Sequence, residues 1–90
     1  MDIPKKLKSI GKWKLREYSK SVYRWEHFEA EDGFGFPLIV TLEHKRLVVG
    51  TESYWQFEPP MGFKGYRKEF SDKNVALKHV KYWMKRHQDL

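Results

Sequence analysis

Three charged residues of this 90-residue chain are spaced like the metal-binding residues of a nuclease. Asp32 precedes an apolar run at residues 38–42, and Glu43 and Lys45 follow that run as an E-x-K pair. Two carboxylates in this order can hold Mg²⁺ while the lysine orients a water or stabilises charge on a phosphate. The upstream acid lacks the proline that usually precedes it in this pattern. A metal-dependent nuclease using Asp32, Glu43 and Lys45 is one hypothesis.

Histidines give a second enzymatic hypothesis. His27, His44, His79 and His87, with neighbouring glutamates, could supply the acid and base of a metal-free ribonuclease. No fixed spacing selects this arrangement, and no two histidines have the i, i+4 spacing of a helical zinc site. The glycines match neither a P-loop nor a dinucleotide-binding motif. We therefore expect no catalytic residues, no metal site and no cofactor.

Basic residues interleaved with aromatic residues are the more prominent feature. Single-stranded nucleic acid binds by stacking its bases on aromatic rings while cations contact its phosphates. The pattern predicts a non-enzymatic nucleic-acid-binding protein, for DNA or RNA. The residues expected to contact nucleic acid are Lys5, Lys6, Lys8, Lys12, Lys14, Arg16, Tyr23, Trp25, Lys64, Tyr66, Arg67, Lys68, Lys78, Lys81, Tyr82 and Lys85.

Charge is segregated along the chain. Residues 1–24 hold eight Lys or Arg and two acids, residues 25–63 hold two and seven, and residues 64–90 hold eight and three. If the two basic ends come together in the fold, they make one positive face that attracts polyanions. The sequence leaves open whether they meet.

A protein-binding module is the alternative from a different class. It would be an accessory protein or inhibitor of the kind that viruses and mobile elements use to block a host enzyme. The acidic middle of the chain, Trp55 and the Pro59-Pro60 loop would then form its surface. Added salt distinguishes the two hypotheses, because phosphate binding weakens steeply with salt and an aromatic-anchored protein interface changes little.

Length and composition favour one small folded domain over residues 1–90. The chain is 17% aromatic and 33% charged, which is typical of a folded protein and not of a disordered one. It has no cysteine, which suits a reducing compartment, and no apolar run of membrane-spanning length. We expect a cytoplasmic protein without membrane contact, either a monomer or a homodimer.

A helix at residues 71–88 is the clearest element that could position these side chains. Ser71 offers a hydroxyl to the first turn, Asp72 places negative charge there, and basic residues follow at the other end. An apolar stripe formed by Ala76, Leu77, Val80, Trp83 and Met84 predicts that one side of the helix is buried. Lys78, Lys81 and Lys85 form a basic stripe beside it.

The remainder predicts an antiparallel sheet. Residues 1–11 indicate a short helix or a basic arm, and residues 12–70 indicate strands separated by turns. Strand alternation places Trp13 and Leu15 opposite Lys14, and Tyr23 and Trp25 opposite Arg24. Residues 38–49 predict a hairpin whose tip is the polar tetrad 43–46. The expected fold is α+β, with four or five antiparallel strands and the C-terminal helix packed on one face.

Overall fold

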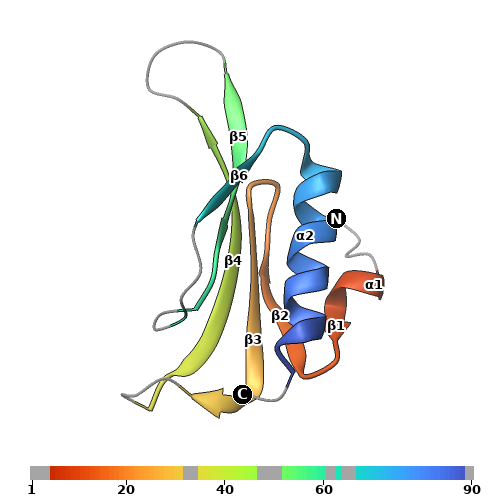
Figure 1. Ribbon diagram of the computed structural model, residues 1–90, viewed down its shortest axis with the longest axis vertical. Coiled ribbons are helices and arrows are strands. Elements are labelled where there is room, and N and C mark those ends of the chain that lie inside the picture. The colour runs from red at the N-terminus through yellow and green to blue at the C-terminus, as the bar shows by residue number, and fades with distance from the viewer. Residues whose placement is uncertain (1–4, 32–34, 47–51, 61–62, 64–66, 89–90) are drawn as a thin grey trace.

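A six-stranded antiparallel sheet and one long helix form most of the protein (Figure 1). The computed structural model describes residues 5–31, 35–46, 52–60, 63 and 67–88. Strands that are neighbours in the sequence are neighbours in the sheet, in the order β1-β2-β3-β4-β5-β6. The elements are α1 (Lys5–Lys8), β1 (Ser9–Ile10), β2 (Trp13–Tyr18), β3 (Val22–Glu31), β4 (Pro37–Arg46), β5 (Ser53–Glu58), β6 (Lys68–Phe70) and α2 (Lys73–Arg86).

The α+β class is confirmed, but the expectation of four or five strands is wrong, because the sheet has six. The unforeseen strand is β1, which has two residues and pairs Ser9 with Lys14 and Ile10 with Trp13. Gly11 makes the reversal before β2 with a φ of 60°, a conformation that favours glycine. A two-residue strand has no periodicity, so the sequence predicted only a helix or arm here.

The polar tetrad at residues 43–46 is not a hairpin tip. It is the second half of β4, which pairs with β5 from Glu43 opposite Gln56 to Arg46 opposite Ser53. The imidazole of His44 stacks on the indole of Trp55 at 4.7 Å between ring centroids, so alternation continues through the tetrad. Four consecutive polar residues suggested a turn. Half of them face away from the core, however, and a strand carries polar side chains on that face.

The core lies on one face of the sheet. Alternate positions of β2 to β5 point toward α2, and their side chains form one hydrophobic cluster with the buried face of that helix. The buried apolar side chains are Leu7, Ile10, Trp13, Tyr23, Trp25, Leu38, Val40, Leu42, Trp55, Phe57, Ala76, Val80 and Met84. Lys14 and Phe28 come from the intervening positions, and the ammonium of Lys14 lies 5.7 Å from the Phe28 ring centroid.

Helix α2 crosses this face and contacts β1, β4, β5 and β6. Ala76, Val80 and Met84 are its buried residues, and Leu77 and Trp83 are partly buried against the same cluster, as the apolar stripe predicted. Figure 1 shows α1 and β1 lying next to the C-terminal half of α2. The two basic ends of the chain therefore come together.

The first turn of α2 is capped by Asp72 and not, as expected, by Ser71. The carboxylate of Asp72 accepts a hydrogen bond from the Asn74 amide at 3.2 Å, and its backbone is extended. A capping residue has extended backbone just before the first helical residue, and Asp72 occupies that position. Within the described ranges, no helix is both long and apolar enough to cross a membrane.

Candidate nucleic-acid interface

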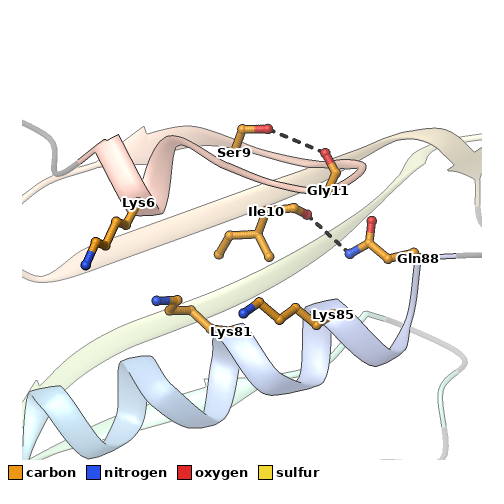
Figure 2. A pocket seen from close by; sticks show the side chains of 7 residues that line it. All are labelled: Lys6, Ser9, Ile10, Gly11, Lys81, Lys85 and Gln88. Carbon is orange, nitrogen blue, oxygen red and sulfur yellow. Dashed lines mark hydrogen bonds between the residues drawn. The ribbon is translucent and has the colours of Figure 1, made fainter.

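A groove separates α2 from α1 and β1, and lysines from both ends of the chain line it. Its volume is about 610 Å³. Figure 2 shows Lys6 entering from one wall and Lys81 and Lys85 from the other. We call this space the lysine groove; its lining residues are Lys6, Ser9, Ile10, Gly11, Lys81, Lys85 and Gln88. An adjoining hollow of about 210 Å³ adds Lys78 and Tyr82 to Lys81 and Lys85.

Gln88 holds the two walls of the lysine groove together. Its side-chain oxygen accepts a hydrogen bond from the Lys12 amide at 2.5 Å, and its Nε2 donates to the Ile10 carbonyl at 3.2 Å (Figure 2). The same Nε2 donates to the Met84 carbonyl at the end of α2. One side chain therefore joins the last turn of α2 to the turn between β1 and β2.

Core side chains reinforce this junction. The indole of Trp13 donates to the His87 carbonyl at 3.0 Å, and the imidazole of His27 is 2.8 Å from the Gln88 carbonyl. The indole of Trp25 donates to the Leu7 carbonyl at 2.8 Å, which fixes α1 on the sheet. These hydrogen bonds from buried side chains tie α1 and the residues after α2 to the sheet.

The lysines of this surface differ from three of the other predicted cations, Lys12, Arg16 and Arg67, in their charge partners. Lys6, Lys78, Lys81 and Lys85 have no carboxylate within 4.0 Å among the described residues. Their charges lie on neighbouring elements and repel one another, so a bound anion would relieve that repulsion. As far as the described residues go, this surface therefore carries positive charge without a paired acid.

Three predicted cations are instead paired with acids from the middle of the chain. Lys12 is 3.0 Å from Glu29, Arg16 is 3.3 Å from Glu26, and Arg67 is 3.5 Å from Glu58. Arg24 also pairs with Glu17. These exposed pairs add little stability, but each one neutralises a charge that the sequence had assigned to the basic face.

The other predicted contacts lie elsewhere or are inaccessible. Tyr23 and Trp25 are 2% and 0% exposed within the core, so neither ring can stack on a base in this fold. Lys14 projects from the face of the sheet opposite α2, and Lys68 lies on edge strand β6. Lys8 is exposed on α1.

Two predicted contacts, Lys64 and Tyr66, lie outside the described residues. Lys5 belongs to α1. Of the predicted aromatics, Tyr82 is the exposed one within the described ranges, at 60%. The structure thus brings together Lys6, Lys78, Lys81, Lys85 and Tyr82 at the two adjoining hollows.

A second groove, which the sequence did not predict, lies on the other flank of α2. Its volume is about 210 Å³, and we call it the aromatic groove. It is lined by His79, Tyr82, Trp83, Arg86 and His87. Trp83 was expected to be core and is only partly buried. The i, i+4 spacing of His79, Trp83 and His87 was the available signal, since such residues share one side of a helix.

Three of the four histidines pack against indole rings. His27 is buried against Trp13 at 4.9 Å, and its Nδ1 accepts a hydrogen bond from the Glu29 amide. His44 stacks on Trp55, and His87 stacks on Trp83 at 3.9 Å. Each of these imidazoles packs against an indole, and the indoles of Trp13 and Trp55 belong to the core.

Only part of the nuclease pattern lies within the residues that the structure describes. Glu43 and Lys45 lie on β4 and project from the face opposite α2, while Asp32 lies outside the described residues. Among the residues that the structure describes, no group of three His, Asp or Glu side chains could hold a metal ion. Lys45 also lies far from the lysine groove in the order of the strands, since β4 is three strands from β1.

Several residues of the surface suggested for a protein partner are buried or paired with cations. Trp55 is 7% exposed and lies beneath the ammonium of Lys73, which is 5.6 Å from its ring centroid. Pro60 is buried, and Glu26, Glu29 and Glu58 of the acidic middle are paired with cations.

Comparison of this sequence and structure with protein-family models, curated proteins and solved structures found no match.

Proposed function

We propose that this protein binds nucleic acid without cutting it and that the lysine groove and the adjoining Lys78 contact its phosphates. One observation carries the proposal: Lys6 from one end of the chain and Lys81 and Lys85 from the other line the same groove. Phosphate contacts supply most of the affinity of sequence-independent nucleic-acid binding.

The shape of the groove supports a polymer of phosphates over a single anion. Lys78, Lys81 and Lys85 follow one another along two turns of α2, and Lys6 faces them from the opposite wall. Charges spread along a groove contact successive phosphates, whereas a site for one phosphate converges on a point. Its rigid walls, joined by Gln88, lower the entropy lost when the ligand binds.

The net charge adds long-range attraction. The formal charge of the whole chain is +6 at pH 7, and the pairs Lys12–Glu29, Arg16–Glu26 and Arg67–Glu58 neutralise cations outside the groove. Lys6, Lys78, Lys81 and Lys85 gather positive charge at one surface, and such a surface raises the rate at which an anionic partner arrives. A cytoplasmic location, and the choice between DNA and RNA, stay predictions.

Fluorescence anisotropy with labelled DNA and RNA tests the proposal. The double variant Lys81→Glu/Lys85→Glu should weaken binding at least about tenfold at low salt, because two phosphate contacts become repulsions. The control Lys20→Glu/Lys45→Glu makes the same change in net charge at a turn and on β4, away from the groove, and should change binding little.

Two results would overturn the proposal. One is the absence of binding at low salt, and the other is an equal loss of affinity in both double variants, which would reduce the effect to net charge. Running the probes on a gel after incubation with Mg²⁺ tests the non-catalytic part, because a cut probe would support the nuclease hypothesis.

A further inference from the structure

Tyr82 stands between the two grooves of α2. Together with Lys78, Lys81 and Lys85 it lines the hollow that continues the lysine groove, and it also lines the aromatic groove on the other flank. A ligand whose phosphates lie along the lysines would therefore reach the aromatic groove by crossing this ring.

The ring of Tyr82 is both exposed and held in place. It is 60% exposed, and its hydroxyl accepts a hydrogen bond from the Arg86 guanidinium at 2.9 Å. The guanidinium carbon lies 5.4 Å from the ring centroid. A ring that is already restrained loses less freedom when a flat partner stacks on it.

Ring contacts link the side chains at the aromatic groove to one another and to Phe63. The rings of Trp83 and His87 are stacked at 3.9 Å, and His87 Nδ1 is 2.7 Å from the Trp83 carbonyl. Phe63 meets both rings edge-on, at 5.7 and 5.9 Å. A flat aromatic ligand would thus meet preorganised ring surfaces.

His79 gives this groove a polar edge. Within the part of the chain that the structure describes, its imidazole nitrogens have no hydrogen-bond partner. Burial and, to a smaller extent, the charge of Lys68 lower the pKa of His79, so the ring is neutral at pH 7. A neutral imidazole offers one donor and one acceptor, and Arg86 has further N–H donors beyond the one that Tyr82 uses.

We propose that the two grooves bind one single-stranded nucleic acid, with its phosphates along the lysines and a base stacked on Tyr82 at the aromatic groove. This inference rests on the proposed function and specifies its ligand. A single strand can turn a base toward the protein, whereas the bases of a duplex are already paired and stacked. His79 and Arg86 would contact the edge of that base.

The experiment compares three labelled probes of equal length by fluorescence anisotropy: a single strand, a strand with the same backbone but no bases, and a duplex. The wild-type protein should bind the single strand roughly fivefold or more tightly than the abasic strand, the gain expected from one stacked base. Tyr82→Ala should bind both strands alike, and Tyr82→Phe, which keeps the ring, should retain most of the preference.

Two variants make the result specific. Phe28→Ala removes another exposed ring, 52% exposed on the opposite face of the sheet, and should leave the preference unchanged. Lys81→Glu/Lys85→Glu should lose affinity for all three probes. Circular dichroism establishes that each variant is folded.

Equal wild-type affinity for the single and abasic strands would overturn the inference, and so would an unchanged preference in Tyr82→Ala. In either case, a loss of affinity confined to the lysine variant would leave the proposed function standing. The absence of binding to every probe would overturn both.

Discussion

The indole nitrogen of Trp13 donates a hydrogen bond to the carbonyl oxygen of His87 across 3.0 Å, joining the start of β2 to the residue that follows α2. The Trp13 ring is fully buried and also meets His27 and Trp83 edge-on. Because this contact links the two basic ends of the chain, it supports both the core and the lysine groove.

Trp13→Phe should lower the free energy of unfolding by about 1–3 kcal/mol, since it removes the donor and leaves the His87 carbonyl without it. Urea denaturation followed by circular dichroism measures the change. An unchanged midpoint would show that the contact adds nothing to stability.

Gly11→Ala should destabilise the protein more than Gly35→Ala. Both glycines have positive φ, which costs other residues roughly 1–2 kcal/mol. A Cβ at Gly11 would also collide with the side-chain amide of Gln88, whereas a Cβ at Gly35 meets no atom within 4 Å. Thermal unfolding of the two variants separates the collision from the backbone strain. Equal losses would mean that Gln88 moves aside without cost.

Asp72→Ala should cost about 1 kcal/mol of stability, because it removes the carboxylate that caps the Asn74 amide. Ser71→Ala should cost much less, since Asp72 and not Ser71 is the capping residue. Chemical denaturation of the two variants gives the comparison. A larger loss of stability in Ser71→Ala than in Asp72→Ala would show that Ser71 is the capping residue, as the sequence predicted.

The stability of the protein should fall as the pH drops below the ordinary pKa of histidine, in part because of His79. Burial and Lys68 lower its folded pKa below 6.5, so the unfolded chain takes up the proton at higher pH than the folded one. The stability that this group contributes is complete above pH 6.5 and is lost as the pH falls through the folded pKa.

His79→Phe keeps a ring against Phe57, which lies 4.9 Å away, and removes the titration. Its free energy of unfolding should therefore fall less than that of the wild type between about pH 7.5 and about pH 5. Lys68→Gln should raise the pKa of His79, measured by NMR titration, because a like charge is removed. Identical pH slopes in wild type and His79→Phe would count against this assignment.

Neutralising single lysines of the groove should change the salt dependence of binding. Lys81→Gln and Lys85→Gln should each reduce the slope of log K against log salt by about 1, the value expected for one lost phosphate contact. Lys45→Gln, on the opposite face, should leave the slope unchanged. Slopes measured between about 50 mM and about 200 mM salt decide the question.

Periodicity predicted the helix and strands of this fold better than it predicted which of their faces are buried. The stripe of α2 and the alternation of Trp13 with Lys14 are local properties, and the structure confirms both. Alternation defines two faces of a strand but not which one is buried. Tyr23 and Trp25 were therefore expected to contact nucleic acid, although both are core residues.

The candidate site depends on pairings that no local pattern encodes. That Arg16 meets Glu26 follows from the register of β2 with β3, and that Lys6 and Lys81 line one groove follows from the packing of β1 against α2. Gln88, whose amide aligns the two walls, is an ordinary polar residue in the sequence. Segregated charge suggested a positive face, and only the fold determines which lysines compose it.

The placement of the lysine groove has a consequence for how the chain folds. Every strand pairs with its neighbour in sequence, so the sheet can grow by closing short loops, each at low entropic cost. The walls of the groove, by contrast, come from opposite ends of the chain and meet only when the largest loop in the molecule closes. A polyanion bound to both walls would bind only the folded protein. By mass action, such a ligand would lower the population of chains whose two ends have separated.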